Sequence, residues 1–590
     1  MIKLDYSRDK LLSDFSKITL RDRYMLPGED SPQEAFARAA EAFADDEDHA
    51  QRIYDYASNL WFMFATPVLS NGGTKRGLPI SCFLNYVDDS REGITGHYTE
   101  NAFLSSFGGG IGGYWGDVRS SGTKTSKGSE STGIIPFLKV VDAEMLAFSQ
   151  GVTRRGSYAG YLNIDHPEIE EFLDVRKPTG GDSNRKCLNL HHGIIVSDRF
   201  METIHLATKE PGYDDSWELI DPHSGEVKKT VSAKALWVKI LQNRMETGEP
   251  YIMFEEAVNN DLPHFQQNKG LRVNQSNLCS EITLATNEER TAVCCLSSVN
   301  LEYYDEWKKI PAFIPDLIRF LDNVLESFIE TAPRELKRAK YSAMRERSIG
   351  LGAMGFHAYL QKNMVSFESA VAAALNEEIF SGIKDLADKE TRRLAVERGA
   401  CPDDDSCTVR NAHLLAIAPN ASSSILCGNT SPSIEPFRAN AFNQKTKSGS
   451  NLLKNKYLDE LLMKKIGHAD LYNETWRSIV VNKGSVQHLD CLSEHEKDVF
   501  KTAVEINQAW VIEHAAERQQ HICQSQSLNL FFPPDVNKGD LHNIHMLAWA
   551  KNLKTLYYLR SEAISRADEV SSQAKREIIF EQSDCLSCEG

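Results

Sequence analysis

Apolar residues recur every three or four positions in several stretches of the chain, a spacing that predicts helices with one buried face. Residues 32–64 predict two such helices, because 31–34 read Ser-Pro-Gln-Glu, a common helix start, and apolar side chains follow at helical spacing. The same pattern predicts longer helices over residues 310–339, 367–399, 502–521 and 540–551. Gly399 is expected to end the second of these, and Asp540 to cap the last.

Shorter stretches rich in β-branched and aromatic residues predict strands between the helices. Residues 78–87 and 291–300 have this composition, and Thr66-Pro67 ends the helical pattern before the first of them. Residues 418–425 predict a strand that ends in a turn of hydroxyl side chains at a helix start. Periodicity by itself therefore indicates a mixed α/β protein.

Composition narrows the class of protein. The 590 residues exceed one ordinary core, and the contents of 41% hydrophobic and 25% charged residues are typical of soluble globular proteins. A net charge of −17 argues against general nucleic-acid binding, which needs a basic surface. The N-terminus lacks the apolar core of a signal peptide, and the apolar run 60–69 is too short to span a membrane. We therefore expect a protein of the cytoplasm, of a cell or an infected host, whose twelve cysteines are thiols.

One short stretch, residues 277–281, combines an amide, a thiol and a carboxylate in the order Asn-Leu-Cys-Ser-Glu. If it is extended, Asn277, Cys279 and Glu281 share one face, because side chains alternate along a strand. Such a face would orient the hydroxyls of a polar substrate while a sulfur reacts. Cysteine is also a common core residue, but a buried amide and carboxylate are costly unless they are paired or used, which favours a functional site.

The run Asn-Leu-Cys-x-Glu, followed by Cys-x-Leu-Ser-Ser-Val-Asn-Leu from residue 294, resembles the radical-site loop and following strand of the large, catalytic subunit of class I ribonucleotide reductases. The resemblance extends from about Thr66 to the end of the chain. It implies an α/β fold, a ten-stranded α/β barrel with a central finger loop and a short helical N-terminal region. The implied parts are the helical region 1–65, the catalytic barrel 66–565 and a flexible redox-active tail 566–590. The residues before the barrel are too few for the N-terminal ATP-cone of relatives that dATP switches off, so we expect a short form without it.

The resemblance also implies roles for five residues of the site. Cys279 would be the thiyl radical that removes the 3′ hydrogen of the ribose, Glu281 the general base for the 3′ hydroxyl, and Asn277 the residue that holds this hydroxyl. Cys82 and Cys294 would supply two electrons by closing to a disulfide. Cys295 lies beside Cys294, but on a strand it faces away, so the register favours Cys294.

Two pairs near the C-terminus would serve electron transfer in such an enzyme. Tyr557 and Tyr558 would relay the radical from a separate small subunit; adjacent tyrosines on a regular strand point to opposite faces, so their stacking requires a bent backbone. A buried aromatic strand is the alternative. Cys585 and Cys588 would carry reducing equivalents to the buried disulfide. Their spacing also fits half of a zinc knuckle, but no second pair of ligands accompanies it.

Further segments match the nucleotide-binding parts of the family. The substrate-binding residues implied by the resemblance are Thr66, Ser81, Gly110, Pro419, Ser422, Ser423 and Ser424. The implied effector-binding residues are Asp89, Ser90, Arg119, Gln150, Arg154 and Arg155. Residues 108–113 formally fit G-x-G-x-x-G, but no apolar-periodic helix follows, so the glycines indicate backbone that closely approaches another group. A plain serine helix cap and a basic surface turn are the alternatives for 422–424 and 150–156.

The function implied is reduction of ribonucleoside diphosphates to deoxyribonucleoside diphosphates, by a ribonucleoside-diphosphate reductase that uses a thiyl radical and a dithiol. The chain would bind no metal and no cofactor itself. It would depend on the metal or radical cofactor of a small subunit, on thioredoxin or glutaredoxin, and on a dNTP or ATP effector with Mg. No nucleic acid or membrane partner is expected, and the sequence leaves a homodimer open.

Two alternatives remain at the level of sequence. A cobalamin-dependent class II reductase shares the barrel and the cysteines, but Tyr557 and Tyr558 favour class I. A nucleotide-binding relative without catalysis is disfavoured because Cys82, Asn277, Cys279, Glu281 and Cys294 are all present. Cys523 stands where we expect an acidic residue in relatives.

Overall fold

The computed structural model describes residues 2–148, 156–446 and 449–561. Its centre is a barrel whose first half consists of five parallel strands in the order β2-β3-β4-β5-β8. The strands are β2 (Cys82–Tyr86), β3 (Gly110–Tyr114), β4 (Ser157–Asn163), β5 (His191–Val196) and β8 (Tyr251–Phe254). Parallel neighbours need crossover connections. These contain α5 (Arg91–Ser106), α6 (Ile135–Ala147), α7 (Ile169–Phe172), α8 (Asp198–Lys209) and α9 (Ala233–Thr247).

The second half of the barrel runs antiparallel to the first. β9 (Ala292–Asn300) pairs antiparallel with β2, and β10 (Ile349–Met354) pairs in parallel with β9. Parallel bridges join Leu351 to Leu415 and Ile417 to Gln526. The ring closes where β13 (Leu530–Phe532) pairs with β15 (Leu559–Ser561) and β14 (Thr555–Leu556) pairs antiparallel with β8. The described segments therefore form the ten-stranded α/β barrel that the resemblance implied, in two halves of five.

The connection between the two halves enters the barrel instead of covering it. It follows α10 (Glu255–Asn259) and α11 (His264–Asn268) and leads into β9, and residues 275–286 are all buried. Its backbone touches β3 and β4 in one half, and the segments around Ser527 and Thr555 in the other. This segment is the central finger loop.

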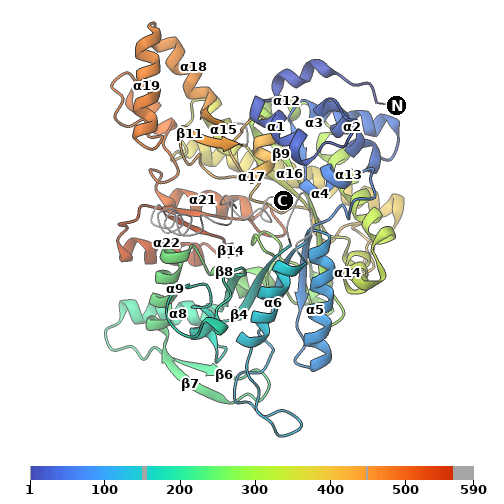
Figure 1. The fold of residues 1–590 in the computed structure, drawn as a ribbon, viewed down its shortest axis with the longest axis vertical. Helices are drawn as coiled ribbons and strands as arrows, with labels where there is room; N and C mark the ends of the chain where they lie inside the picture. Colours follow the sequence, from blue (N-terminus) through green and yellow to red (C-terminus); the bar gives the residue numbers. More distant parts are fainter. Residues whose placement is uncertain (1, 149–155, 447–448, 562–590) are drawn as a thin grey trace.

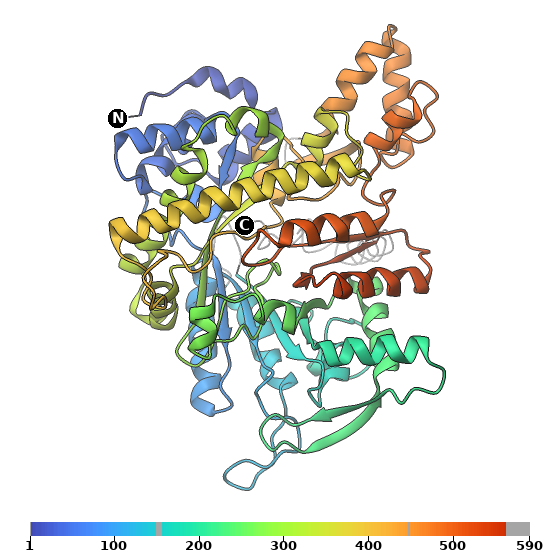
Figure 2. The same cartoon turned by 180° about the vertical axis from the view of Figure 1, so that it is seen from behind.

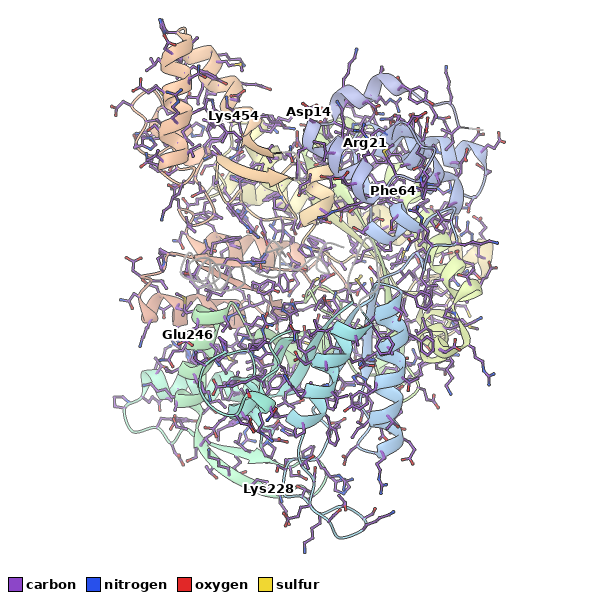
Figure 3. All side chains as sticks on the ribbon, viewed as in Figure 1. Asp14, Arg21, Phe64, Lys228, Glu246 and Lys454 are labelled. Carbon is purple, nitrogen blue, oxygen red and sulfur yellow. The ribbon has the colours of Figure 1, made fainter. Side chains whose placement is uncertain are left out.

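The N-terminal part is helical and lies against α13 (Phe313–Thr331), as Figure 1 shows. The two helices predicted within 32–64 are confirmed as α2 (Pro32–Phe43) and α3 (Glu47–Ser58), preceded by η1 (Tyr6–Leu11) and α1 (Asp14–Arg23). β1 (Phe62–Phe64) then pairs antiparallel with β9, and Figure 3 labels Phe64 in this strand. The ring of Phe64 lies 5.6 Å from that of Phe320 in α13.

Long helices cover the second half of the barrel. α16 (Ala370–Arg398) crosses the molecule and packs against α13 and α21 (Gln508–Gln519), with α22 (Lys538–Ala550) beyond it (Figure 2). The other elements of this half are η3 (Leu301–Tyr303), α12 (Tyr304–Trp307), η4 (Arg334–Leu336), α14 (Lys337–Glu346), α15 (Phe356–Lys362) and α17 (Ala421–Leu426). None of the helices in the described ranges is long and apolar enough to cross a membrane.

Two parts project from the barrel (Figure 1). A hairpin of β6 (Ser216–Ile220) and β7 (Val227–Ser232) extends from one end. At the other end lies a lobe with its own hydrophobic core. Its elements are β11 (Ala441–Thr446), β12 (Gly449–Lys454), α18 (Lys456–Lys465), α19 (Ala469–Val481) and α20 (Glu494–Val499).

Four expectations about helices need correction. Thr66-Pro67 does not end helical structure but begins the short helix α4 (Thr66–Asn71), because proline in a first turn lacks only an N–H that would be unpaired anyway. The helix expected over 310–339 breaks at Pro333, and the one expected over 502–521 begins only at Gln508. The cap of α22 is Asn537 and not Asp540, whereas Gly399 ends α16 as predicted.

Candidate active site

The finger loop turns at the residues that the sequence placed on a strand. Residues 278–280 form a turn, and Ser280 has a positive φ of 65°, which an extended strand does not allow. The expected extended conformation of 277–281 is therefore wrong. Asn277, Cys279 and Glu281 are nevertheless all buried in one turn at the centre of the barrel, because the loop is held by the surrounding strands.

Hydrogen bonds from distant segments fix the backbone of this turn. Ser527 Oγ donates to the carbonyl oxygen of Cys279 (2.6 Å) and to Oε2 of Glu281 (3.1 Å). Thr555 Oγ1 donates to the carbonyl oxygen of Ser280 (2.8 Å), and Tyr161 Oη to that of Asn277 (2.7 Å). A buried turn cannot satisfy these carbonyl groups by itself, so the two halves of the barrel share the task.

The glycine-rich strand β3 makes room for the loop. A Cβ atom added to Gly112 would lie 2.0 Å from the carbonyl oxygen of Ser276, so any other residue would displace the finger loop. The sequence interpretation, that backbone here closely approaches another group, is confirmed. The group is the finger loop itself.

One end of the Asn277 side chain is available to a ligand. Its Oδ1 accepts from the backbone N–H of Ile282 (3.2 Å), which fixes the orientation of the amide. Its Nδ2 is buried and has no hydrogen-bond partner within the described part of the chain. A buried donor without a partner is costly, and a ligand oxygen in the barrel would satisfy it.

The register of the barrel strands pairs two cysteines. Cys82 of β2 lies directly opposite Cys294 of β9, a separation that a disulfide can bridge. Cys295 is the next residue of β9, where it pairs with Ile349 of β10, and successive side chains alternate, so it points to the other face of the sheet, as predicted. Gln524 Nε2 donates to the sulfur of Cys294 (3.7 Å) and to the carbonyl oxygen of Ile349 (3.0 Å).

Burial controls the acidity of the Cys294 thiol. Burial, and then the neighbouring Cys82, raise the pKa of Cys294 well above its usual value, while the hydrogen bond from Gln524 acts in the opposite direction. At neutral pH Cys294 is therefore held as a thiol, the form that a two-electron donor needs before it closes to a disulfide.

The two tyrosines near the C-terminus are in contact. Their ring centroids are 4.3 Å apart, because residues 557 and 558 bridge β14 and β15 outside regular strand pairing. The rings contact each other at a tilt of 54° and are not stacked. Tyr251 of β8 contacts both rings, at 4.8 and 5.0 Å, and the three tyrosines share one buried cluster with Cys279.

The substrate residues implied by the resemblance lie at two places. Ser81 and Gly110 meet where the Gly110 N–H donates to the Ser81 carbonyl oxygen (2.6 Å), while the hydroxyl of Thr66 is 3.1 Å from that of Tyr24. Pro419 precedes α17, whose first turn contains the buried Ser422, Ser423 and Ser424. The cap of α17 is Asn420, so the alternative of a plain serine cap is wrong.

The implied effector residues are only partly brought together. Arg119 Nε pairs with both carboxylate oxygens of Asp89 (3.0 and 2.8 Å), and Nδ1 of His223, from the β6–β7 connection, lies 3.2 Å from Oδ2 of the same carboxylate. Ser90 instead caps α5 by accepting from the N–H of Gly93 (2.9 Å). Gln150, Arg154 and Arg155 lie outside the described residues, as do Cys585 and Cys588.

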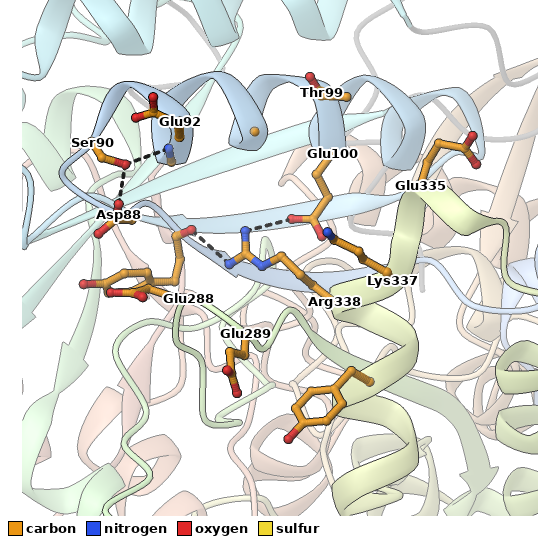
Figure 4. A pocket seen from close by; sticks show the side chains of 14 residues that line it. Asp88, Ser90, Glu92, Thr99, Glu100, Glu288, Glu289, Glu335, Lys337 and Arg338 are labelled. Atoms are coloured by element: carbon orange, nitrogen blue, oxygen red, sulfur yellow. Dashed lines mark hydrogen bonds and ion pairs between the residues drawn. The ribbon is translucent and has the colours of Figure 1, made fainter.

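A cavity of about 870 Å³ opens beside the start of α5, between this helix and α14 (Figure 4). Six carboxylates and two cations line it, and Arg338 Nη1 lies 3.6 Å from Oε2 of Glu100 across it. Because carboxylates dominate the lining, the cavity does not suit the phosphates of an effector nucleotide.

Several residues of the site were missed from the sequence. They are Tyr161, Tyr251, Gln524, Ser527 and Thr555. Each acts on a segment far away in sequence, so no local pattern could reveal it. Cys523 also gains a role: its sulfur accepts from the backbone N–H groups of Leu414 (3.0 Å) and Leu415 (3.2 Å), as a carboxylate could.

Comparisons with known proteins identify this arrangement. The family model described as "Ribonucleotide reductase, barrel domain" matches residues 80–408 and 405–559, and "Ribonucleotide reductase, all-alpha domain" matches residues 10–77. The "Ribonucleoside-diphosphate reductase large subunit" of Invertebrate iridescent virus 3 is 46% identical and covers 100% of both chains. The "Ribonucleoside-diphosphate reductase subunit alpha" of Chlamydia trachomatis is 32% identical over 96% of this chain and 60% of that one.

The fold agrees with a solved structure of the same kind. The "Actinobacillus ureae class Id ribonucleotide reductase alpha subunit" is 35% identical, with a TM-score of 0.82, and the match covers 95% of this chain and 99% of that one. A family match over most of the chain and a full-length relative agree with the barrel that the structure shows. The chain belongs to the ribonucleotide reductase large-subunit family.

Proposed function

We propose that this chain is the catalytic subunit of a class I enzyme that reduces ribonucleoside diphosphates to deoxyribonucleoside diphosphates. One observation carries the proposal: a single buried turn presents Asn277, Cys279 and Glu281 inside a barrel whose strands place Cys82 opposite Cys294. The proposal includes the division into a helical region 1–65, a catalytic barrel 66–565 and a redox tail 566–590.

The chemistry assigns one task to each side chain. The sulfur radical of Cys279 takes the 3′ hydrogen of the ribose, and Glu281 accepts the 3′ hydroxyl proton while the free Nδ2 of Asn277 binds that oxygen. The 2′ hydroxyl leaves as water. Cys82 and Cys294 then give two electrons and two protons and close to a disulfide, and Cys279 returns its hydrogen to C3′. The products are one deoxynucleotide, one water and one disulfide.

The decisive experiment replaces the reacting sulfur. Cys279→Ser should abolish deoxynucleotide formation, because an O–H bond does not give the required radical, while nucleoside diphosphate binding persists. The matched control is Cys401→Ser, a buried cysteine in the loop after α16, which should keep turnover. Turnover by Cys279→Ser, in the presence of a radical-generating small subunit, contradicts the proposal.

The radical would come from a separate small subunit that holds a metal-linked oxidant. The contact of Tyr557 with Tyr558, in one cluster with Cys279, supports a route from that partner to the active sulfur. Tyr557→Phe or Tyr558→Phe should each stop turnover while substrate binding continues. Turnover by this chain with adenosylcobalamin alone, unaffected by either change, would favour class II chemistry instead.

Re-reduction of the buried disulfide needs a carrier, and Cys585 and Cys588 are proposed for it. A tethered dithiol reaches the barrel at high effective concentration and passes electrons from thioredoxin or glutaredoxin. Changing both residues to serine should stop multiple turnovers, whereas the first turnover of pre-reduced enzyme should persist. Loss of that first turnover as well would exclude the carrier role.

Nucleotide phosphates find suitable groups at two places. The first turn of α17 presents backbone N–H groups beside three serine hydroxyls, which suits a substrate diphosphate. Arg119 and Asp89, with Ser90 and the segment that holds Gln150, Arg154 and Arg155, are proposed to bind a dNTP or ATP effector with Mg. Arg119→Ala should change which ribonucleotide is preferred in competition assays without abolishing reduction.

A further inference from the structure

A chain of partly buried polar contacts begins at Tyr558 and continues through His191 to Glu249. Tyr558 Oη lies 3.2 Å from Nδ1 of His191, the first residue of β5. The imidazole ring stands edge-on to the ring of Tyr558, with centroids 6.1 Å apart, and stacks on the ring of Tyr251 at 6.2 Å and 17°. His191 therefore contacts two members of the tyrosine cluster at once.

Glu249 fixes the orientation of this imidazole. Its Oε1 lies 2.6 Å from Nδ1 of His191, and its Oε2 accepts from the N–H (3.1 Å) and from Nδ1 (3.0 Å) of His192. The Glu249 side chain is 1% exposed, and Arg176 Nε lies 3.6 Å from Oε2. Burial alone would raise the pKa of Glu249, but the charges of Arg176 and His191 and the hydrogen bonds from both histidines hold it well below its usual range.

An ionised Glu249 decides which atom of the imidazole carries hydrogen. A carboxylate only accepts, so Nδ1 must carry a hydrogen that points to Oε1, in the neutral ring as well as in the imidazolium. Tyr558 Oη, 3.2 Å from the same nitrogen, is then a second acceptor of this N–H. The hydroxyl hydrogen of Tyr558 must point elsewhere.

We propose that His191 is a positioning residue for Tyr558: its Nδ1–H, aimed by Glu249, is shared with the phenolic oxygen and fixes that oxygen within the cluster of Tyr251, Tyr557 and Tyr558. The inference deepens the proposed function, because it rests on a radical route through Tyr558. His191 receives no proton in this arrangement. It supplies a fixed donor to the phenolic oxygen of Tyr558. Its ring also packs on Tyr251, which helps to hold the three tyrosine rings in contact.

The test places a titratable probe at the tyrosine itself. 3-Nitrotyrosine is incorporated at position 558 of the full chain, and its pKa is read from its absorbance in the parent and in His191→Phe. Phenylalanine keeps the ring but removes the donor, so the pKa of the probe should rise by about half a unit to one unit. His191→Gln, which can still donate, should restore part of the difference.

Glu249→Gln gives the opposite sign. It removes a competing acceptor and a negative charge from the vicinity of the phenol, so the pKa of the probe at 558 should fall. Arg560, whose guanidinium lies 4.1 Å from the centroid of the Tyr558 ring, and Arg176 stay in place in every variant. General loosening of the site would shift the pKa of the probe in the same direction in both variants. Opposite pKa shifts in His191→Phe and Glu249→Gln therefore support a specific hydrogen bond.

The same probe at position 557 is the control. A rise at 558 alone in His191→Phe supports the proposal, while an unchanged pKa at 558, or an equal rise at both positions, overturns it. In the unlabelled enzyme His191→Phe should lower turnover about tenfold, the effect of one lost hydrogen bond, with KM for the nucleotide unchanged. Full activity of Tyr558→Phe would instead refute the radical route through Tyr558. The absorbance measurement would still decide whether His191 donates a hydrogen bond to Tyr558, so the two claims fail independently.

Discussion

At the scale of single residues, the site depends on which polar atoms are paired and which are left available. Nδ2 of Asn277 is a buried donor without a partner among the described residues, whereas the carbonyl oxygens on either side of Cys279 are satisfied by Tyr161 and Thr555. The available donor therefore lies on a backbone that is already fixed. This is the condition for binding a hydroxyl without rearrangement.

Gln524 provides a prediction at this scale. Its hydrogen bond opposes the rise in the pKa of Cys294, so Gln524→Leu should raise that pKa further. Because thiolate is the species that exchanges with disulfides, the pH profile of dithiol reactivity should shift to higher pH by about half a unit to one unit. Alkylation of the pre-reduced enzyme, followed by identification of the labelled peptide across a pH series, measures it.

Gln526→Leu is the matched control for this change. Gln526 is also buried, but its Nε2 donates to the carbonyl oxygen of Ala515 (2.9 Å). Both variants should lose roughly 1–3 kcal/mol of stability because each loses buried hydrogen bonds, and only Gln524→Leu should shift the profile. Equal profiles in the two variants would show that Gln524 does not act on the sulfur.

At the scale of elements, the barrel works as a frame around an irregular loop. Strand β3 approaches the loop so closely that Gly112 has no space for a side chain, and the segments on the opposite side supply donors. Lys554 stabilises those segments: its buried ammonium donates to the carbonyl oxygens of residues 522–524. The reacting residues are thus positioned by elements from both halves of the barrel.

A pair of glycine substitutions tests this frame. Gly112→Ala would place a Cβ 2.0 Å from the carbonyl oxygen of Ser276, so the finger loop must move and turnover should fall by at least about a hundredfold, since small misplacements at a reacting centre are that costly. Gly382→Ala, in α16 with no atom within 4 Å of the added Cβ, should keep turnover and gain about 1 kcal/mol of helix stability. Steady-state kinetics and thermal unfolding of both variants measure the difference, and normal activity of Gly112→Ala would contradict the frame.

At the scale of the whole molecule, burial shifts the pKa of several ionisable groups in the direction that favours their uncharged form. Burial lowers the pKa of His97, His357, His413 and His545 to about 3 and raises that of Glu346 and Glu435 to about 7. The two sets respond oppositely to acid. As pH falls from about 6.5 to about 4.5, the histidines lower the free energy of unfolding, because they bind a proton more tightly in the unfolded chain. The glutamates raise the free energy of unfolding over the same range, because they bind a proton more tightly in the folded protein.

His357 isolates the histidine contribution. Its folded pKa of about 3 lies below the unfolded value of about 6.5, so its stability is complete above that value and is lost as pH falls toward 3. From about pH 7.5 to about pH 5 this amounts to about 2 kcal/mol. His357→Gln keeps an acceptor for the N–H of Phe437. Between these two pH values its free energy of unfolding, measured by chemical unfolding, should fall by about that amount less than the free energy of unfolding of the parent.

An exposed histidine supplies the control. The side chain of His468 is 74% exposed, so His468→Gln should leave the pH dependence of unfolding as it is in the parent. If His357→Gln retained the full acid sensitivity of the parent, the buried neutral imidazole would not be its source.

The sequence by itself determined the local features and the inventory of reactive groups. Helices α2 and α3, the glycine end of α16 and strand β9 follow from caps and side-chain periodicity, which act within a few residues. The candidate residues of the site could also be named from their motifs, and the register of Cys294 opposite Cys82 followed from alternation along a strand, which is a local rule.

Only the tertiary structure decided the shape of the reacting turn and its supports. An extended conformation of residues 277–281 would have put the three side chains on one face, but the structure has a turn whose carbonyl groups are satisfied by Tyr161, Ser527 and Thr555 instead of by a neighbouring strand. The contact between the tyrosine rings and the donor on His191 likewise depend on β5, β8 and the last strands meeting in space. Hydrogen bonds between segments more than a hundred residues apart produce no periodic pattern in the sequence. The geometry of the site is therefore determined by the tertiary structure alone.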